Sequence, residues 1–142
     1  SDESRGLGDV YKRQDMQRSI DFYESLGFEI KKDMIESGPY IDSLLSIDGG
    51  EVNTVKMSLR DGGMVELLHF KNHQEEPTPS SLTNIGCTHF AMTVDNLEET
   101  YNNLVISGVE FVSEPQFSPD GFARVVFCKD PDGTFIELVE EV

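Results

Sequence analysis

Apolar residues recur at the i, i+4, i+7 spacing of one helical face in two separate stretches, residues 15–26 and 96–107. The apolar positions are Met16, Ile20 and Tyr23 in the first stretch and Leu97, Tyr101 and Leu104 in the second. Each stretch starts at a residue suited to an N-cap, Asp15 or Asn96. Each ends before a glycine, which suits the left-handed residue that closes a helix. The pattern therefore predicts two amphipathic helices.

The two helices belong to an internal repeat. Corresponding helix positions differ by 81 residues, as Met16 and Leu97 do. Each half also closes with a turn and an apolar strand, at residues 61–67 and 132–138, where the offset is 71. The first half therefore carries an insertion of ten residues, which we place around residues 37–50. Proline and paired glycines interrupt regular structure there, and a short helical turn is expected.

Each half reads as strand, helix, strand, strand, strand, with further strands at residues 52–59 and 124–129. Neither half can bury its sheet alone, so the two are expected to share one core, with helices outside and a concave sheet surface inside. The predicted fold class is α+β, with two βαβββ modules at residues 15–70 and 84–142. A polar linker at residues 71–83 joins them into one structural domain.

The charge of the chain excludes several partners. Its 142 residues include 27 acidic and 11 basic side chains, which give a formal net charge of −16. Such a surface repels phosphates, so nucleic acid and anionic membranes are not expected partners. No apolar run is long enough to span a membrane, and the polar start lacks the features of a signal peptide. We therefore expect a cytoplasmic protein, in which Cys87 and Cys128 are buried, reduced thiols, with a disulfide between them as the alternative.

Two glutamates stand at matching positions inside apolar strands. Strand alternation groups Glu66 with Met64 and Leu68, and the equivalent Glu137 with apolar neighbours of its own. A carboxylate in such a place is expected to be buried and costly unless it is paired or bound to a cation. The alternative is that both glutamates face solvent in edge strands.

A histidine adds a nitrogen donor to these carboxylates. His89 lies in the strand before the second helix, and alternation turns it away from that helix toward the concave side. One imidazole and two carboxylates suit Zn, Ni, Co, Mn or Fe(II). His69 lies three residues after Glu66, so alternation places it on the opposite side of their strand, and His73 lies in the linker. Both are therefore interpreted as surface residues.

Three segments resemble the vicinal oxygen chelate superfamily, which includes glyoxalase I, bleomycin resistance proteins and extradiol dioxygenases. They are residues 22–28, 89–97 and 129–138. The resemblance covers about residues 15–142 and implies a glyoxalase-like fold, in which curled mixed sheets form a cleft around a divalent metal. It implies that Glu66, His89 and Glu137 are metal ligands and that Glu137 is also the catalytic base.

The resemblance also implies a function. Its glyoxalase-like members are lyases or isomerases that act on a small substrate with vicinal oxygens, through a metal-stabilised enediolate and proton transfer by a carboxylate. A homodimer is the expected assembly. Arg124 and Lys129 are the nearest candidates to bind an anionic substrate group, and alternation leaves their direction open.

Two alternatives remain. The first is a metal-free protein of the bleomycin-resistance kind, which would sequester a small molecule in the same cleft. Aromatic residues such as Phe117 and Phe122 would line that cleft, although packing in the core or a loop is the more common role of such residues. The second is an extradiol-type dioxygenase, which needs another histidine that faces the metal.

The N-terminal segment departs from the repeat. The offset of 81 from His89 leads to Gly8, where the resemblance requires a histidine or glutamine. The expected core-facing positions of this strand are Asp9, Tyr11 and Arg13, and two of these are charged. We therefore hypothesise that residues 1–14 are non-native and that the first strand is lost or replaced. The metal is then bound weakly, completed by water, or absent.

Overall fold

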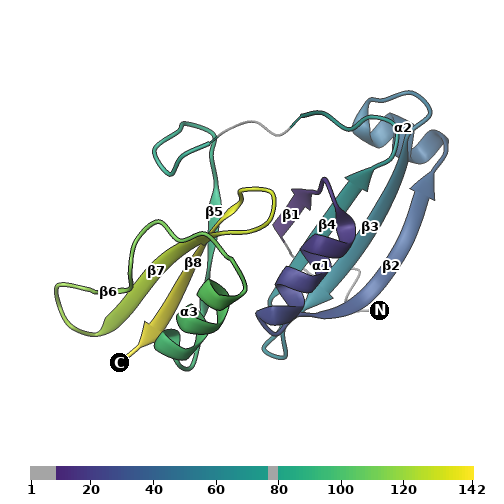
Figure 1. The fold of residues 1–142 in the computed structure, drawn as a ribbon. Helices are drawn as coiled ribbons and strands as arrows, with labels where there is room; N and C mark the ends of the chain where they lie inside the picture. Colours follow the sequence, from purple (N-terminus) through teal and green to yellow (C-terminus); the bar gives the residue numbers. More distant parts are fainter. Residues whose placement is uncertain (1–8, 77–79) are drawn as a thin grey trace. The chain divides into compact units, whose positions relative to one another are not determined.

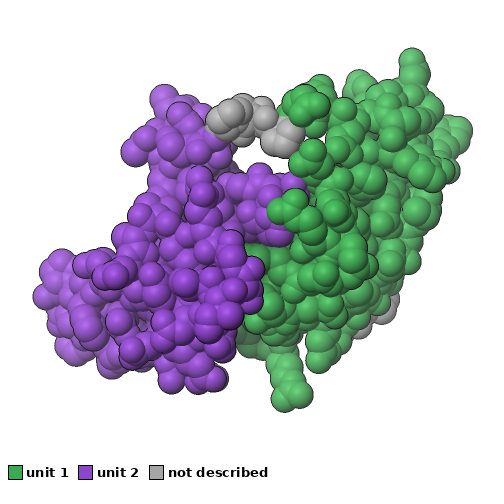
Figure 2. Space-filling view, in the orientation of Figure 1, with its two compact units in different colours: residues 1–77 green, residues 78–142 purple. Residues whose placement is uncertain are grey.

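The computed structural model describes residues 9–76 and 80–142, and the backbone alone for residues 9 and 10. The chain divides into two compact units, residues 1–77 and 78–142 (Figure 1, Figure 2). The division falls within the polar stretch at residues 71–83. No helix among the described residues has the length and apolar character needed to cross a membrane.

Unit 1 contains a four-stranded mixed sheet and two helices. Its elements are β1 (Asp9–Lys12), α1 (Met16–Ser25), β2 (Glu29–Ser37), α2 (Pro39–Leu45), β3 (Glu51–Ser58) and β4 (Met64–Phe70). The strand order is β1-β4-β3-β2, with β1 parallel to β4 and the other neighbours antiparallel. The short helix α2 lies within the insertion that the repeat predicts.

Unit 2 repeats this arrangement without the insertion. Its elements are β5 (His89–Thr93), α3 (Leu97–Ile106), β6 (Gln116–Phe117), β7 (Ala123–Lys129) and β8 (Phe135–Glu141). The strand order is β5-β8-β7-β6, again with a parallel first pair. Two βαβββ modules of the α+β class are therefore present, as the repeat predicts.

Side-chain caps define where the two long helices begin. Asp15 accepts a hydrogen bond from the backbone N–H of Arg18 at 3.2 Å, and Asn96 accepts one from that of Glu99 at 3.0 Å. These bonds satisfy N–H groups that the first helical turn leaves without a partner. At the other end, Gly27 has a φ of 98°, a left-handed backbone that glycine adopts without strain. Both predicted helices and their caps are confirmed.

Each long helix covers one face of its own sheet. Helix α1 packs against β4, and α3 packs against β8. The covered faces hold the most deeply buried apolar residues: Val55, Met57, Val65 and Leu67 in unit 1, and Val126, Cys128, Ile136 and Leu138 in unit 2. Because side chains alternate along a strand, Glu66 and Glu137 stand on the opposite face of each sheet. Alternation therefore leaves both glutamates on the face that the long helix does not cover.

Helix α2 covers part of this opposite face in unit 1. Its buried residue Ile41 packs with Val52, Leu68 and Phe70, which share the face of Glu66. The apolar run of α2 is thus explained by a small second cluster at one end of the sheet.

The first strand is present. Residues Asp9–Lys12 pair in parallel with β4, and the backbone N–H of Arg13 extends the pairing by donating to the Leu68 carbonyl at 2.6 Å. Of the two outcomes expected for the first strand, loss or replacement, loss is wrong, because an edge strand requires only backbone hydrogen bonds from its residues. Gly8 lies outside the described residues, and the non-native origin of residues 1–14 stays a hypothesis.

Removing either helix cap should destabilise its unit. We expect Asp15→Ala and Asn96→Ala each to lower the free energy of unfolding by about 1 kcal/mol, because one N–H loses its partner. Urea denaturation followed by circular dichroism measures this. The matched variants Asp15→Asn and Asn96→Asp retain a capping oxygen and should stay close to the parent, so equal losses in both pairs would contradict the capping role.

Candidate functional site

Glu66 and Glu137 occupy equivalent positions in the two sheets. Glu66 on β4 pairs with Val10 on β1, and Glu137 on β8 pairs with Ala91 on β5. Val10 and Ala91 are 81 residues apart and the glutamates are 71 apart, which confirms the offsets read from the repeat. The two glutamate side chains are 30% and 27% exposed. Both carboxylates are therefore half-buried and not fully buried, and each lies within ion-pair distance of a neighbouring side chain.

In unit 2, Glu137 meets His89. The imidazole Nε2 lies 3.3 Å from Glu137 Oε1, with His89 on β5 two residues before the partner of the glutamate. The ring of Phe127, which stands directly opposite Glu137 on β7, packs edge-to-face on the imidazole at 5.0 Å. Met92 lies three residues after His89, on the opposite side of β5, and is buried on the side of α3. Two of the three predicted ligands are thus brought together on one open face.

In unit 1, Glu66 meets a lysine that the sequence reasoning did not single out. Lys56 stands directly opposite Glu66 on β3, with its Nζ 3.8 Å from Glu66 Oε2. Lys32 stands opposite Lys56 on β2 and shares the same face. The signal that could have found Lys56 is alternation, because its strand neighbours Val55 and Met57 are apolar and core-facing.

The donor atoms of His89 and Glu137 are of types that bind a divalent metal. Imidazole nitrogen and carboxylate oxygen suit Zn, Ni, Co, Mn and Fe(II), and His89 with Glu137 offers one of each. Glu66 is a further donor of the right type, although its carboxylate is paired with Lys56. Within either unit, the described residues include no cluster of three His, Cys, Asp or Glu side chains that could hold a metal. The three-ligand set therefore stays a prediction.

Of the two basic residues considered for substrate binding, only Lys129 shares the face of Glu137. Lys129 lies two residues after Phe127 on β7, with its Nζ 5.4 Å above the Phe135 ring and 3.0 Å from Glu110. It therefore stands beside the His89–Glu137 pair with its charge partly satisfied.

Arg124 lies on the other side of the sheet. Its guanidinium is 3.9 Å from Glu98 on α3 and 5.3 Å above the Phe117 ring. Phe117 and Phe122 are both exposed, so packing in the core, one of the two simpler explanations for them, is wrong. Arg124 and Phe117 therefore stand away from the face that carries Glu137.

The two other histidines do not join the candidate ligands. His69 lies three residues beyond Glu66 and so has the opposite strand parity. His73 is exposed, and its Nε2 lies 2.6 Å from the Asp48 carbonyl oxygen. The expectation of a surface position holds for His73, whereas His69 is only partly exposed.

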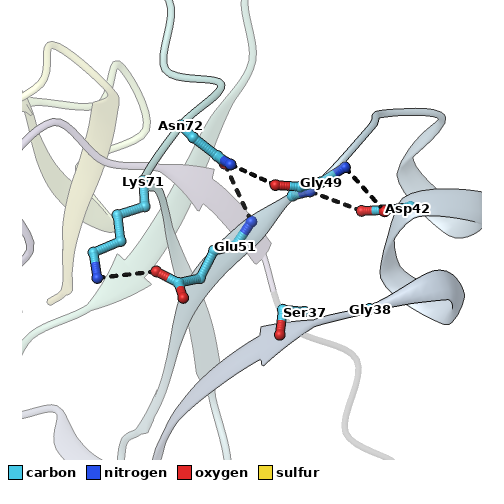
Figure 3. A pocket seen from close by; sticks show the side chains of 8 residues that line it. Ser37, Gly38, Asp42, Gly49, Glu51, Lys71 and Asn72 are labelled. Carbon is cyan, nitrogen blue, oxygen red and sulfur yellow. Dashed lines mark hydrogen bonds and ion pairs between the residues drawn. The ribbon is translucent and has the colours of Figure 1, made fainter.

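A hollow of about 350 Å³ lies elsewhere in unit 1, beside α2 (Figure 3). The Asp42 carboxylate accepts hydrogen bonds there from the N–H groups of Gly49 and Gly50, at 3.0 and 2.8 Å. Lys71 forms an ion pair with Glu51 at 2.9 Å across the same region. These contacts hold the insertion closed, so we assign the hollow a structural role.

The chain resembles known proteins over nearly its whole length. The family model described as Glyoxalase/Bleomycin resistance protein/Dioxygenase superfamily matches residues 10–138. A lactoylglutathione lyase of Arabidopsis thaliana is 28% identical over 142 residues, which are 98% of this chain and 45% of that protein. This chain thus spans less than half the length of the curated relatives that it matches.

Solved structures show the same fold. A glyoxalase family protein from Bacillus cereus superposes with a TM-score of 0.86 at 20% identity, over 96% of this chain and 94% of that chain. The trypanothione-dependent glyoxalase I of Leishmania major gives a TM-score of 0.67 at 22% identity, over 95% and 85%. At these identities the likeness establishes the architecture and not the chemistry.

The cysteines stand apart from the candidate ligands. Both are free; Cys128 is fully buried on the α3 side of β7, whereas Cys87 is only partly buried. Burial, reinforced by the charge of Asp130, raises the pKa of the Cys128 thiol to about 12. Cys128 is therefore neutral at physiological pH and unsuited to be a nucleophile or a metal ligand. The expectation of two buried thiols holds for Cys128 and is wrong for Cys87.

Thiol labelling should separate the two cysteines. We expect DTNB to modify one thiol per native chain at pH 8 and two in denaturant, because the buried and protonated Cys128 is not reactive. Cys87→Ser should then abolish fast labelling of the native chain. Rapid labelling of two thiols per native chain by DTNB would contradict the burial of Cys128.

Proposed function

The chain belongs to the glyoxalase/bleomycin resistance protein/dioxygenase superfamily, and we propose that it is a metal-dependent lyase or isomerase of the glyoxalase kind. The observation that carries this proposal is the His89–Glu137 pair, an imidazole and a carboxylate 3.3 Å apart on an open sheet face. The similarity to a lactoylglutathione lyase supports the same class of reaction. A cytoplasmic location and a homodimer, both expected from the sequence, are parts of the proposal.

Three residues would hold the metal in this proposal: Glu66, His89 and Glu137. When bound, a divalent ion supplies Lewis-acid stabilisation of negative charge on two neighbouring substrate oxygens. Zn, Ni, Co, Mn and Fe all match the nitrogen and oxygen donors. The local positive charge also makes an anionic substrate compatible with an acidic chain.

Glu137 is the proposed catalytic base. Its carboxylate takes a proton from a carbon that bears one of the two vicinal oxygens and returns it to the neighbouring carbon. The hydrogen only changes position, so the reaction needs no external oxidant or reductant. His89 contacts Oε1 of Glu137 and orients the carboxylate, while Phe127 lies directly opposite Glu137 as an apolar wall. These contacts would limit the side from which water and substrate approach.

The proposed substrate class is a small molecule with adjacent oxygens, such as the hemithioacetal that a thiol forms with a 2-oxoaldehyde. Lys129 shares the face of Glu137 and is the residue best placed to bind an anionic group of that molecule. Its present partner, Glu110, would have to release it.

A metal-free binding protein is the second candidate. The ion pair between Lys56 and Glu66 favours it, because this carboxylate is neutralised without any metal. An extradiol-type dioxygenase gains no support, because the parity of His69 turns it away from Glu66. Turnover and metal affinity distinguish the two candidates.

Loss of the proposed base should remove activity. We expect Glu137→Gln to lower kcat for the hemithioacetal of methylglyoxal and glutathione by about 10²- to 10⁴-fold, because the amide cannot accept the proton. Steady-state absorbance assays with Ni²⁺, Co²⁺ or Zn²⁺ present measure this. Glu141→Gln, an exposed carboxylate on the same strand, is the matched control. Binding of the substrate without turnover by the parent would favour the second candidate.

Metal affinity should respond to changes at His89 and at Gly8, which correspond to one another in the internal repeat. We expect His89→Ala to weaken Co²⁺ binding at least about tenfold, because a donor is lost. Gly8→His should strengthen binding by supplying the ligand that the family pattern places on the first strand. Calorimetric titration of metal-stripped chains measures both. Equal, tight metal content in Gly8→His and the parent would contradict the hypothesis that a first-strand ligand is missing.

A further inference from the structure

We propose that the outer edge of β2 is a docking surface for a second copy of this chain. The two β2 strands pair antiparallel about a twofold axis at Met34, so that Lys32 of each copy stands opposite Glu36 of the other. The homodimer of the proposed function thereby gains a defined surface. The inference does not depend on the proposed reaction, because it concerns association alone.

The first support is the length of the unpaired edge. Strand β2 is the outermost strand of its sheet (Figure 1), and no described strand pairs with its outer side. It runs for nine residues, whereas β6, which has the same place in the sheet of unit 2, has two. Edge strands are usually kept short, because their free N–H and C=O groups invite pairing with another chain. The long edge of unit 1 is therefore suited to extension of its sheet.

The second support is the regular geometry of β2 around Met34. The register with β3 shifts between Ile30 and Lys32 and is then continuous to Ser37. A second β2 strand can therefore pair regularly with this continuous stretch. A twofold axis perpendicular to the sheet keeps paired residues on the same face, and side chains alternate between faces. Only a register centred on one residue satisfies both conditions.

The third support is the charge pattern, which selects one of these registers. Centring on Lys32, Asp33 or Glu36 sets two like charges directly opposite one another, which destabilises a strand pair. Centring on Ile35 brings no opposite charges together. Centring on Met34 places Lys32 opposite Glu36 twice, once on each side of the axis. The charges therefore favour the register centred on Met34.

The fourth support is that Lys32 forms no ion pair within the part of its own chain that the structure describes. It stands directly opposite Lys56, which is itself paired with Glu66. Glu36 shares the face of Lys32, but it lies four residues further along an extended strand, about 13 Å away. Its Oε1 accepts a hydrogen bond from Thr54 at 2.8 Å, which orients the carboxylate. A second copy supplies the missing ion-pair partner to Lys32.

The expected dimer is weak and depends on concentration. Ile35 is 61% exposed, and a neighbouring strand covers part of it. Five paired residues on each strand bury less than the roughly 1,200–2,000 Å² of a standard interface, so the association is transient. We therefore expect a dissociation constant of about 10–100 µM, which salt should raise because it screens the two ion pairs.

Charge reversal followed by sedimentation equilibrium of the full chain tests this proposal. We expect Lys32→Glu and Glu36→Lys each to raise the dissociation constant at least about tenfold, because like charges then oppose one another twice. An equimolar mixture of the two variants should form heterodimers, and the double variant should form homodimers, since both restore opposite charges. Lys31→Glu makes the same change of charge on the same strand, opposite the uncharged Ser37, and should stay within about threefold of the parent.

Cross-linking tests the register. In a chain that carries Cys87→Ser, a short bismaleimide should join two copies of Met34→Cys, because residue 34 faces its own equivalent across the axis. It should not join two copies of Ser37→Cys, whose equivalents lie about 20 Å apart in this register. Cross-linking of both variants with equal yield would contradict the register.

Three outcomes would overturn the proposal. A parent chain that stays monomeric at about 500 µM leaves the edge of β2 to a strand of a different protein. A dimer that neither charge reversal weakens has its interface elsewhere. Failure of the mixture and of the double variant to associate, while circular dichroism shows folded chains, excludes the ion pairs. Failure of the proposed function has a different signature, because loss of turnover or metal binding leaves the association of the chain unchanged.

Discussion

The parallel pairing of the first and last strands in each unit is the constraint on which the candidate site depends. In unit 2 it aligns Ala91 with Glu137, so that His89, two residues earlier on β5, shares the face of the glutamate. Parallel neighbours need a crossover, and here α3 lies within the connection and covers the other face. The same pairing therefore buries the apolar face and leaves the polar donors together.

The two glutamates occupy equivalent backbone positions, but the side chains that surround them differ between the two units. The strand pairs place Glu66 and Glu137 identically, yet their neighbours on the adjacent strand are Lys56 and Phe127. The backbone of a duplicated module determines where a side chain stands, and the residue type determines what it can bind. The neighbours of the two carboxylates therefore differ between the units, although the strand pairing that places them is the same.

Much of the fold could be predicted because its signals are local. The helices follow from apolar spacing and from capping at Asp15 and Asn96, and the duplicated strands follow from a constant offset. Whatever depends on which strands pair was harder to predict. The ion pair of Lys56 with Glu66 depends on the register of neighbouring strands, which is not visible in a single strand. The same holds for the direction of Arg124 and for the presence of β1.

The strand register also determines how charged residues are distributed over the sheet of unit 1. The chain carries −16 overall, but Lys12, Lys32 and Lys56 share the face of Glu66, since they pair with or beside residues of that face. Alternation along three separate strands places these basic residues together, although they are scattered in the sequence. Glu29 and Glu36 also share the face of Glu66, so its strand positions carry equal numbers of acidic and basic side chains, unlike the chain as a whole. An acidic protein can in this way still offer a face from which an anionic molecule is less strongly repelled than its net charge indicates.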